Sequence, residues 1–362
     1  MNSGVRIRQV RELLGKTQTE FADLAGVSQP AIAQLEAGST AASEQTLQNL
    51  SLNTGFPVEF FKAEPRLELP LGSLLYRAHV GASTKERARA YRLAQLLYEF
   101  IESVSEEIER PPVRLPRLST DPTLGAHLTR SAMGHAPDVP IPNLINSIER
   151  AGVIVLSLPV ATEKIDAFSV WAGPTSEQPL IGVVTNKPPD RLRFSVAHEL
   201  GHLVLHHPLR VSPEEAERQA HQFAAELLLP ETVMRSEITT PITLSSLAPL
   251  KPKWRVSIQA LIRRSFDLQM ISERQYRYLF EQLSARGMRR DEGVPIATEL
   301  PRGLRKIVEV LYGSDVSPDR LAKLMGLPIS ITRNILDSHS RREDLESRRA
   351  PRLLRFDQER IQ

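Results

Sequence analysis

The sequence predicts a multidomain, mainly α-helical protein with an α+β part. The first 60 residues follow the pattern of short amphipathic helices joined by tight turns, residues 153–185 contain short apolar runs typical of strands, and most of the rest has helical spacing. A length of 362 residues favours two or three domains. We divide the chain into an N-terminal all-α domain (1–66), a connector helix (67–112), an α+β domain (113–290), and a C-terminal helical region with a tail (291–362).

Composition narrows the class of protein. Hydrophobic residues make up 41% of the chain and charged residues 25%, as in ordinary soluble proteins. No run of 18 apolar residues and no apolar signal-peptide core occurs, so we expect no membrane partner and a cytoplasmic location. The chain contains no cysteine. Disulfides and thiolate ligands are therefore excluded, and any metal must be held by histidine and carboxylate side chains.

The N-terminal helices can be placed from their caps. A first helix around Val5–Leu14 ends at Gly15, and a second begins near Thr17. Gly26 then permits a tight turn, and Ser28 caps a third helix. A fourth helix covers residues 43–52.

The remaining elements follow from periodicity and from breakers. We expect a long amphipathic helix over residues 83–110, a short one near 124–133, and another over 141–151. Residues 153–156, 167–172 and 179–185 read as strands. Helices are expected over 192–206 and 213–229, within 256–285, and within 301–337, before a charge-alternating tail from 341.

The stretch RFSVAHELGHLVLHH, residues 193–207, holds a candidate metal site. His198 and His202 lie four apart, so a helix places both imidazoles on one face, where they can bind the same zinc ion. Glu199 between them can take a proton from a water molecule. The alternative is that both histidines are buried in a hydrophobic core, with their ring nitrogens hydrogen-bonded to neighbouring groups. A catalytic zinc site usually has a third protein ligand, and the extended pattern HExxHxxGxxH fails here, at Leu205 and Pro208.

The third ligand is therefore expected from the next helix, EEAERQAHQFAAELLLP. Glu217 lies slightly off the apolar face of this helix, and His221 follows four residues later on the same side. Glu226 is a weaker candidate. Composition and spacing leave these three open.

RLRFSVAHELGHLVLHH followed by ERQAHQFAAELLLP resembles the ImmA/IrrE family of metallopeptidases, and WRVSIQALIRRSFDLQMISERQYRYLFEQLSARG resembles its C-terminal continuation. The resemblance covers residues 70–290. It implies a zincin-like domain with a small twisted sheet and one Zn²⁺ per chain, held by His198, His202 and Glu217, with Glu199 as general base. His221 stands where the family commonly has Asn or Asp, which leaves the coordination slightly open.

A group that stabilises the oxyanion is also needed. Arg191 and Arg193 flank the start of the HExxH helix, and His206 follows its end. Each of the three is a candidate, and for each the alternative is an ordinary surface or capping role.

The stretch TQTEFADLAGVSQPAIAQLEAGS resembles a helix-turn-helix of the XRE/phage-repressor type. A third helix of this kind presents its first residues to the major groove. The resemblance implies that Gln18 contacts a phosphate and braces Gln29. The DNA-contacting candidates are Gln18, Ser28, Gln29, Ala31 and Gln34. The alternative is a small bundle that docks protein.

Charge argues against a strong DNA binder at the N-terminus. Residues 1–65 hold five Lys/Arg against seven acids, a balance of −2, and the third helix has no Lys or Arg. Since phosphate neutralisation supplies non-specific affinity, we expect binding to need a homodimer. Residues 251–290 hold ten Lys/Arg against three acids. They are either phosphate contacts or the solvated face of a helical pair.

Together these features predict a regulator that binds operator DNA and is also a zinc-dependent endopeptidase. The resemblance suggests a protein substrate of the repressor or antitoxin-like kind, in stress or mobile-element control. One alternative is a non-enzymatic transcription factor whose peptidase-like domain only senses a ligand. Another is an antitoxin whose C-terminal helices bind a toxin. An intact Glu199 argues against a pure sensor, which does not need a general base.

Overall fold

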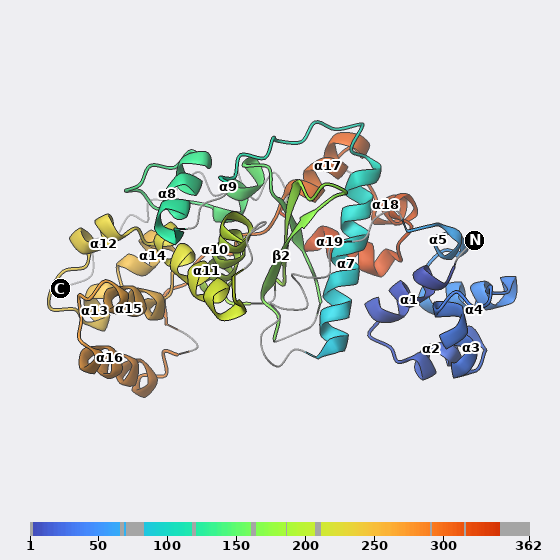
Figure 1. Ribbon diagram of the computed structural model, residues 1–362, viewed down its shortest axis with the longest axis horizontal. Coiled ribbons are helices and arrows are strands. Elements are labelled where there is room, and N and C mark those ends of the chain that lie inside the picture. The colour runs from blue at the N-terminus through green and yellow to red at the C-terminus, as the bar shows by residue number, and fades with distance from the viewer. Residues whose placement is uncertain are drawn as a thin grey trace, which may run out of the picture.

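The computed structural model describes residues 3–65, 69, 83–117, 121–160, 164–185, 187–206, 211–289, 292–314 and 316–340. Helices surround one three-stranded sheet, with the N-terminal helices at one end of the molecule and α12–α16 at the other (Figure 1). The mainly helical fold with a small sheet is the predicted one. The tail from 341 lies outside the described residues.

The N-terminal domain contains five helices: α1 (Gly4–Leu13), α2 (Gln18–Ala25), α3 (Gln29–Glu36), α4 (Glu44–Thr54) and α5 (Val58–Lys62). Thr17 and Glu20 form a capping box at the start of α2. Gly26 ends α2 at φ 70°, a left-handed conformation that glycine adopts without strain. The Ser28 side chain then accepts a hydrogen bond from the backbone N–H of Ala31 and starts α3. These caps produce the predicted helix-turn-helix.

Helix α7 (Thr84–Ser103) is the long helix predicted over residues 83–110, although it ends at residue 103. It lies between the N-terminal domain and the sheet (Figure 1). A buried ion pair, Arg6 Nη1 to Glu99 Oε2 at 2.9 Å, joins α7 to α1. Most α7 residues from Ala90 to Ile101 are buried, so this part of the connector is packed against its neighbours. Two shorter helices follow, α8 (Pro122–Ala132) and α9 (Leu144–Arg150).

The sheet has the order β1-β3-β2, with β1 (Ile154–Ser157) parallel to β3 (Gln178–Val183) and β2 (Ala167–Ala172) antiparallel to it. Alternate residues of β2 face opposite sides. Phe168 and Val170 pack in the core shared with α7, while Trp171 packs in the core shared with α10 (Pro189–Leu205). The Trp171 indole N–H donates to the Leu203 carbonyl of α10 at 3.2 Å. Helix α10 therefore covers one sheet face and α7 the other.

The helices after α10 are α11 (Pro213–Leu228), α12 (Glu231–Glu237), α13 (Leu244–Leu247), α14 (Leu250–Trp254), α15 (Ile258–Asp267) and α16 (Glu273–Ala285). The predicted helical stretch 256–285 is thus two helices. The chain then returns to the N-terminal side of the sheet with α17 (Gly303–Tyr312), α18 (Pro318–Met325) and α19 (Ile329–Asp337) (Figure 1).

Two hydrophobic cores hold these elements. One joins the N-terminal helices, α7, one sheet face and α17–α19. The other joins the opposite sheet face, α8–α11 and α12–α16. Among the described residues, no helix is both long and apolar enough to cross a membrane.

Candidate functional site

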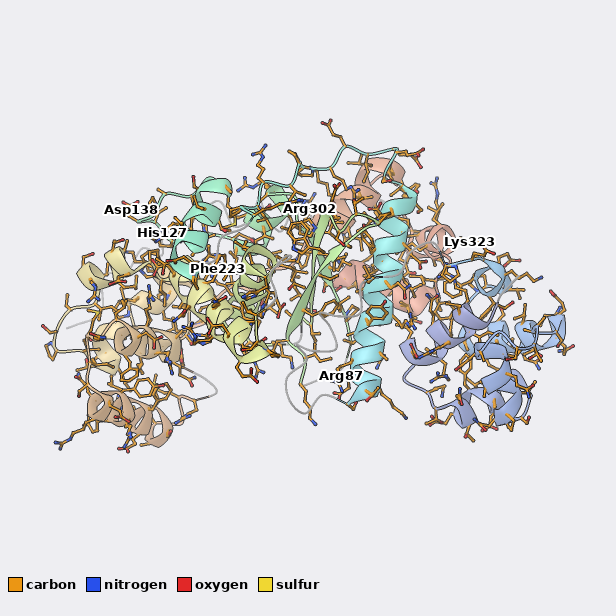
Figure 2. All side chains as sticks on the ribbon, in the orientation of Figure 1. Arg87, His127, Asp138, Phe223, Arg302 and Lys323 are labelled. Atoms are coloured by element: carbon orange, nitrogen blue, oxygen red, sulfur yellow. The ribbon has the colours of Figure 1, made fainter. Side chains whose placement is uncertain are left out.

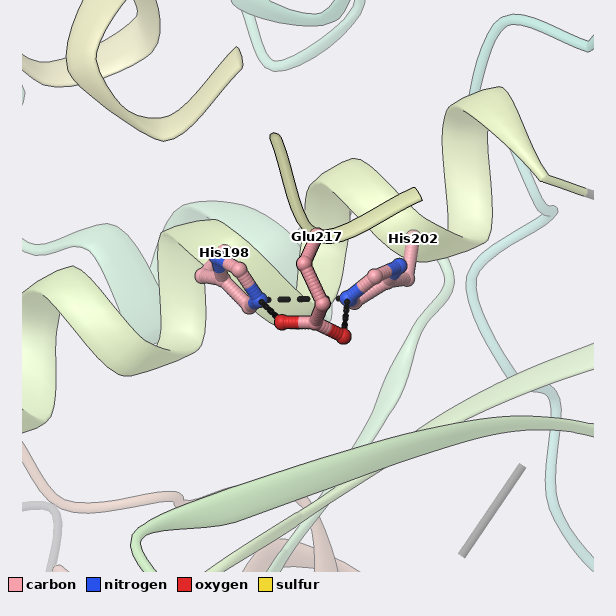
Figure 3. Close-up of side chains that lie close together, drawn as sticks. All are labelled: His198, His202 and Glu217. Carbon is pink, nitrogen blue, oxygen red and sulfur yellow. Dashed lines mark hydrogen bonds and ion pairs between the residues drawn. The ribbon is translucent and has the colours of Figure 1, made fainter. Parts of the chain in front are cut away.

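Three side chains converge where α10 and α11 cross. His198 and His202 point from α10 toward Glu217 on α11 (Figure 3). The two Nε2 atoms are 3.1 Å apart, His198 Nε2 lies 3.1 Å from Glu217 Oε2, and His202 Nε2 lies 3.2 Å from Glu217 Oε1. This is the predicted set, and its donor atoms could ligate one ion.

Close packing of the two helices produces this convergence. A Cβ built on Gly201 would lie 2.9 Å from Phe223 Cδ1 and 3.2 Å from Ala220 Cα, so only glycine fits without displacement. Phe223 is fully buried between the helices (Figure 2). Gly201 therefore lets α11 approach α10 closely, which brings Glu217 to the histidines.

The donor set has the chemistry of a metal site. Hydrogen bonds with His198 and His202 hold the pKa of the Glu217 carboxyl well below its usual range, so it is ionised at neutral pH. His202 is buried and His198 is partly exposed. Two imidazole nitrogens and one carboxylate are the ligand set of one class of catalytic zinc sites, which keep a further position open. The residues present fit such an ion.

His206 orients one of the candidate ligands. Its Nδ1 lies 2.9 Å from His202 Nδ1, and its Nε2 lies 3.0 Å from Gln219 Oε1. This contact occupies Nδ1 of His202, and Nε2 of the same ring remains directed at Glu217. Such outer contacts fix the ring and tautomer of a ligand histidine. His206 also lines the cleft, beside the candidate ligands.

Glu199 is a buried carboxylate beside the ligand group. Its Oε2 accepts a hydrogen bond from Ser169 Oγ at 2.7 Å, and Ser169 itself is fully buried in β2. Glu199 is not part of the converging ligand group, yet it lines the same cleft. A hydrogen bond from β2 of the sheet therefore fixes the position of the Glu199 carboxylate.

A cleft of about 2100 Å³ opens over the site. Helices α10, α11, α15 and α16 and residues 292–296 line it, with His198, Glu199 and Glu217 on one wall. The volume exceeds that of common small-molecule pockets, which measure about 300–1,000 Å³. A segment of polypeptide is a suitable occupant.

One expectation about the neighbouring arginines needs correction. Arg193 does not line the cleft: it is buried, with its guanidinium bonded to Glu299 and to the Ile141 carbonyl. It is therefore a structural ion pair and no candidate for the oxyanion. Arg191 does line the cleft, but it is bound to Asp166 at 2.6 Å and 3.1 Å.

The other candidate ligands of α11 lie outside the ligand group. The His221 ring packs against Phe194 with centroids 5.0 Å apart, and burial lowers its pKa. It lines the cleft without joining the three donors. Glu226 is buried in an ion pair with Arg264 and also contacts His127.

The polar surface of the helix-turn-helix is arranged in a chain of contacts. Gln29 Nε2 donates to Gln18 Oε1 at 2.9 Å, as expected, and Gln18 Nε2 donates to Glu36 at 3.0 Å. Gln34 is exposed on α3, Ala31 is half-buried, and Ser28 is the exposed N-cap. Ser28, Gln29, Ala31 and Gln34 thus lie at the start of α3 or on it, and Gln18 contacts Gln29 from the start of α2.

Sequence reasoning missed two residues of the site, Ser169 and Gln219. Ser169 is the one polar side chain in the apolar strand AFSVWA, and this was the only available signal. Its partner lies 30 positions away, so the contact depends on how β2 packs on α10.

The family comparisons agree with this geometry. Residues 7–61 match the helix-turn-helix family, and residues 148–266 match the IrrE N-terminal-like domain of the M78 peptidases. No curated protein matches the chain. The chain therefore joins an N-terminal helix-turn-helix DNA-binding domain to an IrrE N-terminal-like domain of a metallopeptidase family.

Proposed function

We propose that the chain is a DNA-binding regulator whose second domain is a zinc-dependent endopeptidase. The observation that carries the proposal is the convergence of His198, His202 and Glu217 beside Glu199, in one large cleft. In such a donor set zinc supplies a Lewis acid and lowers the pKa of water.

The proton transfers of the proposed reaction are assigned to protein side chains. Water attacks the carbonyl carbon of the scissile peptide bond, and Glu199 takes its proton. The carbon–nitrogen bond breaks, and Glu199 gives the proton to the leaving amine. Ser169 donates to Oε2 of Glu199, which leaves Oε1 to carry the proton.

The helix-turn-helix supports the regulatory half of the proposal. We infer that Gln29 and Gln34 of α3 read base edges of an operator, with Gln18 holding Gln29 in place. The N-terminal domain carries little free positive charge, and a homodimer would double its contacts. The proposed substrate is a repressor or antitoxin-like protein whose cleavage changes expression at that operator.

One comparison tests the enzymatic half. The protein and its Glu199→Gln variant are each co-expressed with the protein encoded by the neighbouring gene, and cleavage is followed by mass spectrometry. We expect wild type to cut at a defined bond and the variant, with zinc retained, to leave the partner intact. Equal cleavage by both would overturn the role of Glu199. Equal regulation in cells would support a sensor instead.

A gel-shift comparison tests the DNA half. Gln29→Ala should lose sequence preference on the gene's own upstream DNA, because a glutamine contact to adenine discriminates by about 1–3 kcal/mol. Lys253→Ala, an exposed substitution outside this domain, is the control. Unchanged preference in Gln29→Ala would indicate a protein-docking bundle.

A further inference from the structure

The three C-terminal helices repeat the first three helices of the chain. Helices α1, α2 and α3 have 10, 8 and 8 residues, and α17, α18 and α19 have 10, 8 and 9. Helices α2 and α18 begin at positions 18 and 318, and α3 and α19 begin at 29 and 329. The match to the helix-turn-helix family covers only residues 7–61.

The turn between the second and third helices is the same in both units. Gly26 ends α2 at φ 70° and ψ 33°, and Gly326 ends α18 at φ 63° and ψ 30°. The next residue in each unit, Val27 or Leu327, donates its N–H to the carbonyl five residues earlier, at 3.1 Å and 3.0 Å. The backbone path therefore agrees hydrogen bond by hydrogen bond.

The buried positions also correspond. Those that fix the second helix to the third are apolar or fully enclosed in both units: Phe21 and Leu321, Ala22 and Ala322, Ile32 and Thr332, Leu35 and Ile335. Each pair is separated by 300 positions.

A turn of this kind does not by itself make a helix-turn-helix. Gly55 ends α4 in a similar way, but α5 has only 5 residues. Arg255 is left-handed before α15, but that helix lines the candidate metal cleft and buries its first residue, Ile258. Outside the N-terminal domain, α18 and α19 are the only pair in the described part of the chain that combines the turn with matching lengths and an exposed second helix.

The exposed face of α19 has the same positions as that of α3. Positions 1, 2, 6 and 9 counted from the helix start are exposed in both: Gln29, Pro30, Gln34 and Ala37 in the first unit, Ile329, Ser330, Asn334 and Asp337 in the second. Arg333, at position 5, is exposed as well, where α3 has the half-buried Ala33. The outward face of α19 is thus more polar and carries one cation, Arg333, and one anion, Asp337.

The cations of the two units differ in availability. In the N-terminal domain Arg6 pairs with Glu99, Arg8 with Glu12, Arg11 with Glu36 and Lys62 with Glu44, which leaves the half-buried Lys16. In the C-terminal unit Arg320, Lys323 and Arg333 are exposed, and no ion pair is found for them within the described ranges. Lys323 projects from α18 on the side of the molecule where the N-terminal domain lies (Figure 2). Unpaired cations beside an outward helix face are available to phosphates.

We propose that helices α17, α18 and α19 form a second helix-turn-helix that binds double-stranded DNA through α19. Arg333 has the chemistry to recognise guanine and Asn334 adenine, while Arg320 and Lys323 neutralise phosphates. The unit is joined to the first: a Cβ on Gly55 would lie 3.4 Å from Pro328 Cβ, and one on Gly326 3.7 Å from Phe60 Cδ2. The chain thus holds two DNA-binding elements within one core.

A salt titration tests the electrostatic part of the proposal. The full chain and the triple variant Arg320→Ala/Lys323→Ala/Arg333→Ala are titrated against a fluorescent mixed-sequence 30-base-pair duplex at several salt concentrations. The plot of log K against log salt has a negative slope, and each lost phosphate contact makes it shallower by about 0.9. We expect the triple variant to lose up to about two such increments, one each for Arg320 and Lys323, because Arg333 is assigned to a base edge. Its melting temperature should stay that of wild type, because all three side chains are exposed.

The matched control removes three exposed arginines that lie outside the basic segment 251–290: Arg114, Arg218 and Arg235. It has the same net charge as the test variant and should keep the wild-type slope. Equal losses in both variants would show that net charge alone acts, and no loss in the test variant would show that α18 and α19 do not meet DNA. Either result overturns the proposal.

Cross-linking tests the surface itself, because the chain has no cysteine of its own. A single cysteine introduced by Ser330→Cys, carrying a photoreactive group, should cross-link to the duplex, and one introduced by Ser131→Cys in α8 should not. A cysteine at Gln34 reports on the first unit separately. Cross-linking from Ser330 to a second protein chain in place of DNA would make α19 a protein-docking face and refute the proposal.

Discussion

Gly201→Ala tests whether helix packing sets the metal site. A new Cβ would lie 3.2 Å from Ala220 Cα and 2.9 Å from Phe223 Cδ1, whereas ordinary contacts begin at 3.4 Å. Helix α11 must therefore move by roughly 0.5 Å, and Glu217 moves with it. Alanine in a helix gains about 1 kcal/mol over glycine, while overpacking costs about 1–3 kcal/mol. We expect a net loss of about 0–2 kcal/mol in unfolding free energy.

The same displacement should weaken metal binding. Ligand atoms must lie within about 0.2 Å of their ideal distances, and loss of supporting contacts costs about 10–100-fold in affinity. Thermal unfolding of the metal-free protein and competition with a zinc chelator measure the two effects. Adding Phe223→Leu removes the closer clash and should recover part of both. A more stable Gly201→Ala protein with unchanged zinc affinity would refute the reasoning.

Three further changes are informative. His206→Ala should lower zinc affinity about 10–100-fold in the chelator assay, because His202 loses the partner at its Nδ1. His339→Asn should remove a pH dependence of thermal unfolding: burial lowers the pKa of His339 to about 4 from 6.5, so protonation favours the unfolded state, and up to about 3 kcal/mol of wild-type stability is lost as pH falls from 6.5 toward 4. Ser169→Ala should slow cleavage about 10–100-fold with zinc content unchanged, because Glu199 loses a hydrogen bond worth about 1.5–3 kcal/mol.

A specific result would contradict each of these three predictions. Undiminished zinc affinity in His206→Ala would mean that His202 is oriented by its own packing. An acid destabilisation of His339→Asn equal to wild type would assign the effect to other groups. Loss of zinc from Ser169→Ala would place that residue in support of the ligands rather than of Glu199.

The sequence predicted features that depend on local signals. Ser28 and Gly26 determine where α2 ends and α3 begins, and both are visible in the sequence. The spacing of His198 and His202 predicted their shared face in the same way. Glu217 needed the family resemblance, because a spacing argument left His221 and Glu226 open.

Features that depend on distant partners could not be predicted. Arg193 was a candidate for the cleft because it begins the HExxH helix, but Glu299, 106 positions later, binds it in the core. His339 accepts a hydrogen bond from the Ser157 backbone 182 positions away. Whether such a side chain is buried or exposed depends on tertiary packing.

Zinc stoichiometry tests the central claim most directly. Wild type, Glu199→Gln and Glu217→Gln are dialysed against trace zinc, and metal per chain is measured by mass spectrometry. We predict about one zinc per chain in wild type and in Glu199→Gln, and a large loss in Glu217→Gln, because a neutral amide is a poor ligand. Equal zinc in all three proteins, or none in wild type, would contradict a site built from His198, His202 and Glu217.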